Sequence, residues 1–446
     1  MARPAELMTI IRPDWLLVAA DQAPRRGWSI RVDGGVVDTT GPHVELAARY
    51  PDDEIVDAAG HVVLPGFVDA HTHLYGVLAH GIPPPSGGGP TDFWSFLADY
   101  WWPLVEDALD IDMVVAATDH GCGEMLRSGI TTFYDIVEAP GALPGVLDAQ
   151  REVVERHGLR GLLSVEATER AGPEVARLAL DENTRHLRAS RDHELIGGLM
   201  CWHTTFTCSA TYIREAAERA RELGASMHCH LNEGEHEGRW AAEHLGCSTL
   251  EFYDRLGVAG PELLASQCVQ LTPADRTVLA ERGVRVSHMP LANCEVGGGI
   301  APVPELVDDG VTVGLGTDGY IQDFFEVLRG AFLVHKARRR DPAVMDARLV
   351  LSLATEGGAR ALGLERVGRL EPGWAADLQV VDLDLPTPVD EHNLTEQLVV
   401  WRNRRHVRDV MVAGRWRVRG GEVIGTDLTA SRQRVRAAAR RLWERP

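Results

Sequence analysis

The sequence has 446 residues, of which 45% are hydrophobic and 25% are charged, a composition typical of a globular protein with a large core. This composition excludes a chain that is disordered or coiled coil throughout. The formal net charge of −20 argues against a nucleic acid or an anionic membrane as partner, because both require a basic face on the protein.

The cysteine count and the hydropathy pattern bear on the compartment. Seven cysteines in a chain of this length are few and odd in number, unlike a disulfide framework. No apolar run approaches the roughly 18 residues that a membrane span needs. The N-terminal segment carries charges through its apolar stretch, unlike a signal peptide. We therefore expect a cytoplasmic protein.

The chain begins and ends with strand patterns and has a different pattern between them. Residues 1–60 contain short β-branched or aromatic runs broken by Asp, Pro and Gly, which predict a first set of β-strands. From 61 to 365, apolar strand-like runs alternate with helical stretches, which predicts parallel βαβ units. Strand patterns return over 366–425, and the amphipathic, Arg-rich tail at 426–446 predicts a terminal helix that packs on one face.

About eight strand–helix units fit into the middle region, and this number favours a closed barrel. We predict an α/β fold: a (β/α)8 TIM barrel with a small composite β-sandwich domain formed by both chain ends. The predicted barrel strands are at 63–69, 129–135, 161–167, 197–203, 225–231, 263–268, 284–288 and 311–317.

Two histidines follow the first predicted barrel strand. His71 and His73 are separated by one residue and come directly after an apolar run. In an extended strand, residues i and i+2 point to the same side. Two imidazoles that project together at the carboxyl end of a barrel strand are well placed to hold one metal ion.

A second histidine pair lies at the end of the predicted strand at 225–231. The text MHCHLNE places His228 and His230 two residues apart and adds Glu233. Metal-dependent hydrolysis needs ligands and a separate acid or base near the bound water. We predict His230 as a ligand and Glu233 as the proton carrier, whereas His228 lies one layer deeper and is expected to be packed.

A late barrel strand ends in an acid, Asp318, in the text GLGTDG. An Asp-Gly pair alone is an ordinary turn signal. As the fourth member of a His, His, His, Asp set, however, it leaves one coordination position open for water. One divalent metal, Zn²⁺ first and Fe²⁺ second, suits this mixture of imidazole and carboxylate donors.

These motifs together resemble the cytosine-deaminase/chlorohydrolase branch of the amidohydrolase superfamily, which includes triazine hydrolases, guanine deaminase and S-adenosylhomocysteine deaminase. The resemblance covers nearly the whole chain, through PGFVDAHTHL, WHTTFTCS, HCHLNEGEHE and VSHMPLANCEVGGGIAPVPELVDDGVTVGLGTDG, and closes with VGRLEPGWAADLQVVDLD. The resemblance implies a mononuclear site of His71, His73, His230 and Asp318.

The resemblance also implies roles for single residues. Asp318 would act as base toward the bound water, Glu233 would deliver a proton to a ring nitrogen of the substrate, and His203 would contact the substrate. Binuclear members of the superfamily bridge their metals with a carbamylated lysine on the fourth strand. Lys336 is the only lysine of this chain and follows the last barrel strand, so it cannot take that role.

The chain departs from the family at the sixth barrel strand. Where the family usually shows A-H-C-V-H-L, this chain has S-Q-C-V-Q-L, with Gln267 and Gln270 in place of both histidines. The first of these histidines normally hydrogen-bonds the metal-bound water. An amide can donate or accept a hydrogen bond, but it cannot relay a proton near neutral pH. We count Gln267 with the catalytic residues Glu233 and Asp318.

Three outcomes of this departure are open. The enzyme still deaminates, with Asp318 and Glu233 carrying all proton transfers; it performs other amidohydrolase chemistry, such as ring opening or dechlorination-type displacement; or it is a non-catalytic heterocycle-binding relative. We place first a metal-dependent hydrolase that acts on a C–N bond other than a peptide bond and deaminates an amino-substituted N-heterocycle.

Further substrate contacts are expected from position alone. They are Tyr75 and Asn293 at the rim of the pocket and His288 on the seventh strand, together with His203. The aromatic-rich segment at 93–103 fits packing or a subunit interface better than substrate stacking, with one aromatic side chain reaching the pocket. By analogy with relatives we expect a homodimer.

Overall fold

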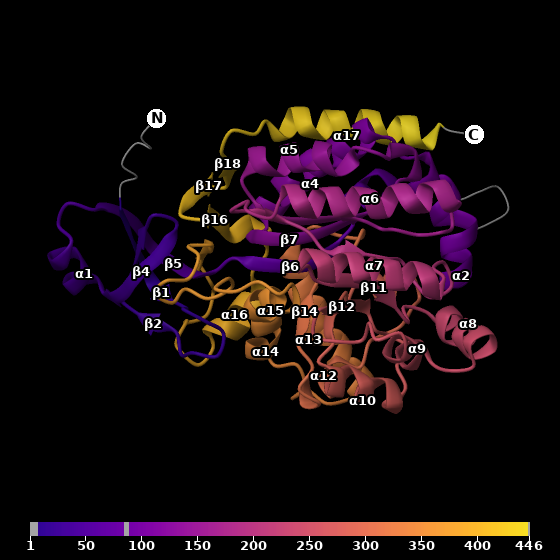
Figure 1. Cartoon of the computed structure of the whole chain (residues 1–446). Coiled ribbons are helices and arrows are strands. Elements are labelled where there is room, and N and C mark those ends of the chain that lie inside the picture. Colours follow the sequence, from indigo (N-terminus) through magenta and orange to yellow (C-terminus); the bar gives the residue numbers. More distant parts are fainter. Residues whose placement is uncertain (1–7, 84–88, 445–446) are drawn as a thin grey trace.

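A computed structural model describes residues 8–83 and 89–444 of the chain. Strands from the two ends of the sequence form one nine-stranded sheet in the order β18-β17-β16-β15-β5-β1-β3-β4, with β2 paired to β1 (Figure 1). The strands are β1 Thr9–Leu16, β2 Arg25–Arg26, β3 Trp28–Asp33, β4 Val36–Pro42, β5 Glu54–Pro65, β15 Leu378–Asp382, β16 Val407–Val412, β17 Arg415–Arg419 and β18 Glu422–Val423. The two chain ends therefore share a sheet, as predicted.

The middle of the chain forms parallel strands in two sheets, ordered β6-β7-β8-β9 and β10-β11-β12-β13-β14. Single parallel bridges join them, one between Thr72 and Asp318 and one between Ala167 and Trp202. The strands are β6 Phe67–Thr72, β7 Ile130–Val137, β8 Arg160–Val165, β9 Ile196–Gly197, β10 Met200–Cys201, β11 Met227–Leu231, β12 Leu263–Gln267, β13 Arg285–His288 and β14 Val313–Leu315. This arrangement confirms the predicted α/β fold with parallel strands.

Two predicted barrel strands differ in the structure. The run expected at 63–69 is divided between β5, which ends at Pro65 in the nine-stranded sheet, and the parallel strand β6, which begins at Phe67. Residues 197–203 were expected to form one strand, but β9 and β10 are separated by a break at Gly198. A side chain at Gly198 would meet the carbonyl oxygen of Leu163 at 2.5 Å, so this close approach of two backbones requires glycine. The break divides the strand between its two neighbours, since β9 pairs with β8 and β10 pairs with β11.

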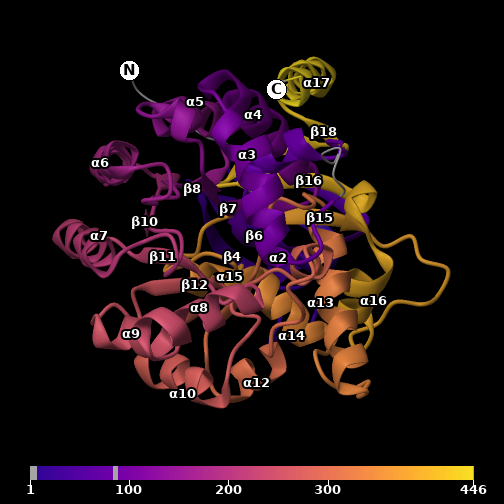
Figure 2. The same cartoon turned by 90° about the vertical axis from the view of Figure 1, so that its right-hand side faces the viewer.

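Helices connect the parallel strands and surround them (Figure 2). Side-chain caps begin several of them: Asp110 accepts from the Met113 amide at the start of α4, and Thr272 and Asp275 form a capping box on α10. The helices of this region are α4 Ile111–Arg127, α5 Val146–His157, α6 Pro173–Ala189, α7 Ala210–Leu223, α8 Glu235–Leu245, α9 Thr249–Arg255, α10 Pro273–Arg282, α11 Ala292–Glu295, α12 Val303–Asp308, α13 Phe324–Arg339, α14 Ala347–Ser352 and α15 Gly358–Ala361.

The remaining helices lie at the edges of the fold. An irregular helix at 93–104 consists of α2 Phe93–Ser95, a π-helical stretch η2 Phe96–Trp101 and α3 Trp102–Leu104. The others are α1 His43–Arg49, α16 Leu394–Trp401 and α17 Leu428–Trp443, with short 3-10 turns at η1 Leu74–Ala79, η3 Glu106–Ala108, η4 Pro140–Ala142 and η6 Arg404–His406, and a π-helical turn η5 Leu353–Gly357.

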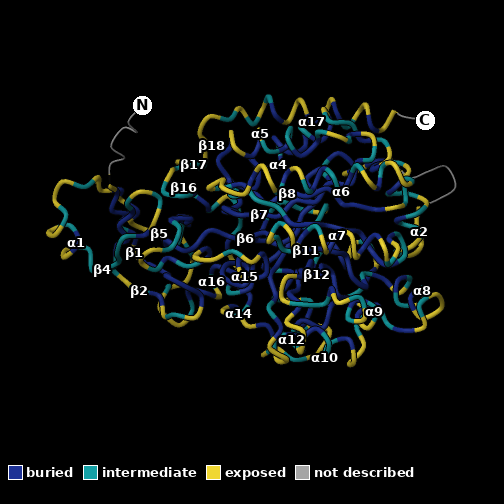
Figure 3. The backbone as a smooth tube through the Cα atoms, in the orientation of Figure 1, coloured by how far each residue is buried: buried dark blue, intermediate teal, exposed yellow. Residues whose placement is uncertain are grey.

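The core lies between the parallel strands and their helices. Figure 3 shows the central strands as buried and the outer faces of the helices as exposed. Terminal helix α17 buries one face, with Ser431, Val435, Ala438 and Leu442 turned inward, and it lies along α4 (Figure 1). This confirms the predicted packing of the tail on one face. Within the described residues, no helix is long and apolar enough to cross a membrane.

Candidate metal and active site

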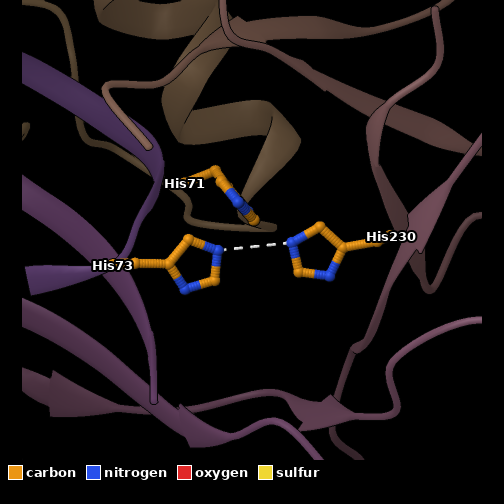
Figure 4. A group of neighbouring side chains, drawn as sticks. All are labelled: His71, His73 and His230. Atoms are coloured by element: carbon orange, nitrogen blue, oxygen red, sulfur yellow. Dashed lines mark hydrogen bonds between the residues drawn. The ribbon is translucent and has the colours of Figure 1, made fainter. Parts of the chain in front are cut away.

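The metal ligands predicted from the sequence meet at the carboxyl ends of three parallel strands. His71 ends β6 and His73 follows it, His230 lies in β11, and Asp318 follows β14. Nε2 of His73 is 3.3 Å from Nε2 of His230 and 3.6 Å from Oδ1 of Asp318. Figure 4 shows the three imidazoles converging on one point, with ligand atoms that lie within 4.8 Å of one another.

The hydrogen bonds of these rings leave nitrogen atoms free for a metal. Both ring nitrogens of buried His71 have no hydrogen-bond partner. Burial and the neighbouring imidazoles of His73 and His230 hold the pKa of His71 well below its usual value, so this ring is neutral. Nδ1 of His73 donates to the carbonyl oxygen of Ile136 at 2.7 Å, which leaves Nε2 as the coordinating atom. This donor set fits a zinc-type ion.

Gln267 holds the carboxylate of Asp318. Its Nε2 donates to Oδ2 of Asp318 at 2.8 Å, and its Oε1 accepts a short hydrogen bond from Nδ2 of Asn293. The amide of Gly319 donates to the other oxygen, Oδ1, at 2.8 Å. Asn293 is fully buried and acts through Gln267, so the structure places it behind the pocket and not at its rim, as had been expected.

Backbone conformation is unusual where these strands end. Asn232, Gln267, Cys268 and Asp318 have φ angles of 49°, 72°, 50° and 59°, which lie in the left-handed region. Non-glycine residues enter this region rarely and at a cost of about 1–3 kcal/mol each. The strained turns aim the side chains of Gln267 and Asp318 toward the same point.

Glu233 lines the same cavity from the turn after β11. Burial raises the pKa of Glu233 well above its usual value, and the nearby Asp318 carboxylate raises it further. This raised pKa favours the protonated form of Glu233, the state that a proton donor requires.

Glu166 is a site residue that the sequence reasoning missed. It directly follows β8 and is buried, with Oε1 lying 2.7 Å from Nδ1 of His230 and 3.5 Å from Nε2 of His203. The contact to His230 is bent, so neither atom makes a hydrogen bond of normal geometry. Burial alone would raise the pKa of Glu166, but His230 and His203 hold it well below its usual value. The one available signal was a carboxylate immediately after an apolar strand.

Glu166, His203 and His230 form a second group of three possible ligands within 4.8 Å. A carboxylate beside the outer nitrogen of a metal-binding histidine commonly fixes the tautomer of that ring. Nδ1 of His203 lies 2.8 Å from the Thr207 hydroxyl, and burial lowers the pKa of His203 to about 4, so this ring is neutral. We therefore assign Glu166 to the orientation of His230.

A cavity of about 440 Å³ opens in front of these residues, within the range of small-molecule sites. Tyr75 lines it and donates its hydroxyl proton to Oε1 of Glu106 at 2.9 Å. The irregular helix at 93–104 supplies one wall, with several aromatic rings where one had been expected. The lining includes His73, Tyr75, Phe93, Phe96, Tyr100, Trp101, Trp102, Glu106, Glu166, His203, His230, Glu233, Gln267, Glu295, Asp318 and Tyr320.

The structure does not bring His288 to this cavity. Its ring is fully buried, and its Nε2 lies 3.0 Å from Nε2 of His335 on α13. The side chain leaves β13 toward the surrounding helices, so the expected substrate contact is corrected. His228 is packed as expected, between the rings of His71 and Tyr134.

Lys336 lies on α13, outside the site. Its Nζ donates to the carbonyl oxygens of Pro342, Val344 and Met345, at 2.9, 2.6 and 3.4 Å. A bridging carbamylated lysine is therefore absent from the described site. The ligand geometry suits a single metal ion.

Comparison with known proteins agrees with this geometry. The model of the family described as "Amidohydrolase family" matches residues 62–417. A 5-methylthioadenosine/S-adenosylhomocysteine deaminase of Desulforudis audaxviator is 33% identical over 431 residues, which cover 93% of this chain and 95% of the relative. A 5'-deoxyadenosine deaminase of Methanosarcina mazei is 34% identical over 394 residues, covering 86% and 87% of the two chains.

Solved structures are similar over nearly the whole chain. An adenosine deaminase from Xanthomonas campestris with bound zinc has a TM-score of 0.88 at 26% identity and covers 99% of both chains. An atrazine chlorohydrolase from Arthrobacter aurescens, complexed with zinc, has a TM-score of 0.83 at 22% identity, covering 97% of this chain and all of the other, and therefore supports the fold alone. The chain belongs to the amidohydrolase family.

Proposed function

We propose that this protein is a metal-dependent hydrolase that releases ammonia from an amino-substituted N-heterocycle, with a 6-aminopurine as the first candidate substrate. The observation that carries this proposal is the convergence of His71, His73, His230 and Asp318 on one cavity that Glu233 also lines. Relatives named as deaminases match this chain over most of their own length, which supports a C–N hydrolase. Because these relatives are named for adenosine derivatives, we propose that the cavity takes an adenine group.

Four side chains would hold the metal, and we propose Zn²⁺ because structural neighbours carry zinc and three donors are imidazoles. The bound ion would lower the pKa of a water molecule so that it attacks at neutral pH. Asp318 accepts the proton of this water, and Glu233 gives its proton to a ring nitrogen of the substrate. The leaving ammonia would take up the proton that Asp318 received. As the C–N bond breaks and the carbonyl forms, the remaining hydroxyl proton would pass to the Glu233 carboxylate, so both acids return to their starting states.

Gln267 takes a positioning part in this mechanism. Its amide holds Oδ2 of Asp318 but cannot carry a proton. Asp318 and Glu233 therefore carry all proton transfers. We place ring opening, dechlorination-type displacement and a non-catalytic binding role behind deamination, since all four metal ligands and Glu233 are retained.

We also propose the finer architecture expected from the sequence. Parallel bridges at Thr72–Asp318 and Ala167–Trp202 support closure of the two parallel sheets into a (β/α)8 barrel. The division into β domain, barrel and terminal helix stays a prediction, and β5 crosses the expected boundary at residue 60 because it runs to Pro65. The composite β-sandwich, the cytoplasmic location and the homodimer also stay predictions.

Metal analysis followed by an ammonia-release screen tests the proposed function. We expect about one zinc per purified chain. We expect ammonia from at least one compound in a panel of adenine nucleosides, aminopyrimidines, pterins and aminotriazines. Zinc-loaded protein that binds these compounds and releases no ammonia would favour the binding role, and protein that holds no metal would contradict the assigned ligands.

A further inference from the structure

The cavity wall is rich in carboxylates, and its described lining contains neither Arg nor Lys. Five acidic residues line it. The five are Glu106, Glu166, Glu233, Glu295 and Asp318. The raised pKa of Glu233 favours its protonated form, and Asp318 would lie beside the metal ion, so the remaining carboxylates are Glu106, Glu166 and Glu295. An anionic group beside these three would lose its hydration and meet no Arg or Lys side chain in return. Such uncompensated burial of a charge is strongly unfavourable.

A guanidinium does lie behind this wall, but acidic partners already surround it. Arg170 contacts Oε1 of Glu138 at 2.5 Å, Oδ1 of Asp107 at 2.8 Å and Oε2 of Glu106 at 3.4 Å. It also packs over the ring of Trp102, with its guanidinium carbon 4.7 Å from the ring centroid. Because three carboxylates already contact the Arg170 guanidinium, its positive charge is neutralised and does not attract a substrate anion.

Glu166 has no basic counter-ion of its own. Its side chain is 3% exposed, and its ion-pair contacts in the described structure are the imidazoles of His230 and His203. Its Oε1 lies 2.7 Å from Nδ1 of His230, and the residue lines the cavity. A buried carboxylate in this state attracts a positive or hydrogen-donating group.

Aromatic rings line the cavity together with these acids. Trp101, Trp102 and Tyr100 come from the irregular helix at 93–104, and Tyr75 lies near them, with its ring centroid 6.1 Å from that of Trp101. Faces of such rings attract cations and planar heterocycles. Carboxylates and aromatic rings on one cavity wall are therefore matched to an amine or an amino-heterocycle.

We propose that the cavity selects neutral or cationic amino-heterocycles and rejects those with a short anionic substituent, and that Glu166 is a specificity-determining residue for this choice. The proposal rests on the proposed function. It specifies the charge of the substituent that the heterocyclic substrate carries. It concerns groups inside this cavity, because Arg239 lines a second cavity beyond Phe93 and Phe96 that a longer anionic arm could reach.

Glu166 supplies a negative charge to the cavity and an acceptor oxygen to His230, and substitutions can separate these two roles. Glu166→Gln removes the negative charge and keeps a carbonyl oxygen that can accept from Nδ1 of His230. Glu166→Ala removes both. Glu169→Gln is the matched control, because Glu169 is an exposed carboxylate three residues away, bonded to the Ser209 amide outside the cavity.

The experiment compares ligands that share one scaffold and carry a short positive, neutral or negative substituent. The probes are 5'-amino-5'-deoxyadenosine, 5'-deoxyadenosine and adenosine-5'-carboxylic acid, with a triazine pair that carries an aminoethyl or a carboxymethyl arm. Dissociation constants are measured by calorimetry on the full, zinc-loaded chain in a Glu233→Gln background that slows turnover, and zinc content is checked for each variant.

We expect the amine to bind about 10-fold or more tightly than the carboxylate, the effect of one uncompensated charge in a partly solvated cavity. Glu166→Gln should reduce this ratio at least about threefold, and Glu169→Gln should leave it unchanged. Equal or tighter binding of the carboxylates, an unaltered ratio in folded Glu166→Gln, or no binding of any amine or neutral ligand on either scaffold would overturn the proposal.

The ratio of amine to carboxylate affinity in the chain with Glu166 intact already tests whether the cavity rejects anions. This test remains available even if Glu166→Gln does not fold. Failure of the proposed function gives a different result. Ligands would then bind in the expected order of charge, yet protein with Glu233 intact would release no ammonia from them.

Discussion

Gln267 and Asp318 are joined by a hydrogen bond of 2.8 Å from the amide nitrogen to the carboxylate. Asn293 fixes the direction of this bond, because its own amide donates to Oε1 of Gln267 and so turns the Gln267 nitrogen toward Asp318. Gln267, which stands where the resemblance implies a histidine, thus keeps a donor toward the carboxylate that we propose as catalytic. The ability to exchange a proton is what this chain has lost.

Removal of this donor should slow the reaction without loss of the metal. For Gln267→Ala we expect kcat to fall about 10- to 100-fold with zinc content unchanged, since one positioned hydrogen-bond donor is lost. Steady-state kinetics with parallel metal analysis provides the measurement. Gln270→Ala is the control, because the Gln270 amide donates to Gly298 and the residue lies outside the metal cavity; its activity should change less than about threefold.

The family residue can also be restored at this position. Gln267→His keeps a ring N–H donor toward Asp318 but removes the oxygen that Asn293 donates to. If catalysis depends on the amide of Gln267, kcat should fall in this variant. Activity that appears only in Gln267→His would instead identify the present chain as a non-catalytic relative.

Metal binding should depend on the three converging histidines and not on buried histidines in general. We expect His71→Ala to lower the zinc content well below one per chain, because the proposed site loses one of its four protein ligands. His288→Ala removes an equally buried imidazole that faces His335 and should keep its zinc. Equal zinc content in both folded variants would contradict the assigned ligand set.

Removal of zinc should also lower thermal stability, because a ligand that binds only the folded state stabilises it. Chelator-treated protein should unfold at a lower temperature and recover when zinc is added back. His71→Ala should show little further loss on chelation. A chelation effect of full size in that variant would place the stabilising metal elsewhere.

Glu233 should contribute to catalysis by donating its proton to the substrate. Glu233→Gln keeps the size and polarity of the side chain but cannot deliver a proton, and we expect kcat to fall about 10²- to 10⁴-fold. The pKa of Glu233 is raised by burial and by Asp318, so the enzyme keeps the protonated form until the pH exceeds this raised value. The alkaline limb of the pH–rate profile should therefore depend on Glu233, and a limb retained in Glu233→Gln would assign it to another group.

Much of this site could be predicted because each ligand lies at or just beyond the carboxyl end of an apolar strand. Carboxyl ends of neighbouring parallel strands lie together, so short local motifs place His71, His73, His230 and Asp318 near one another. The relation of the two terminal strand sets was also predictable, since alternating runs at both ends resemble each other.

Other features could not be derived from local pattern. Glu166 stands alone in the sequence, and its partner His230 is supplied by β11, so only the fold reveals the pair. His288 was misplaced because strands of a parallel sheet are buried on both faces, and burial alone does not tell which face a side chain takes. The break at Gly198 depends on the carbonyl of Leu163 on a neighbouring strand.

Asp135 gives a prediction for stability against pH. It is fully buried beneath the site and accepts from the Leu74 amide and from Nε2 of Gln150, both at 2.7 Å. Burial raises its pKa from 3.8 to about 6. The folded chain thus holds a proton that the unfolded chain has released between these values, so this group costs stability as the pH rises through that window.

Asp135→Asn should therefore raise the melting temperature above pH 6 relative to the parent chain. The gain corresponds to about 1–3 kcal/mol, because a pKa shift of one unit is about 1.4 kcal/mol and the lost charge-assisted bonds offset part of it. Gln150 can turn its free Oε1 toward the new amide. The gain should shrink toward pH 4, as measured by thermal unfolding across this range.

Asp119 is the control with the opposite sign. A hydrogen bond to His157 and ion pairs to Arg434 and Arg156 hold its pKa below its usual value. Its contribution is therefore present above pH 4 and is lost as the pH falls through the lowered value. Asp119→Asn should lower the melting temperature at pH 7, partly by loosening α17 through Arg434, and the loss should fade in acid. Parallel pH trends in the two variants would contradict both assignments.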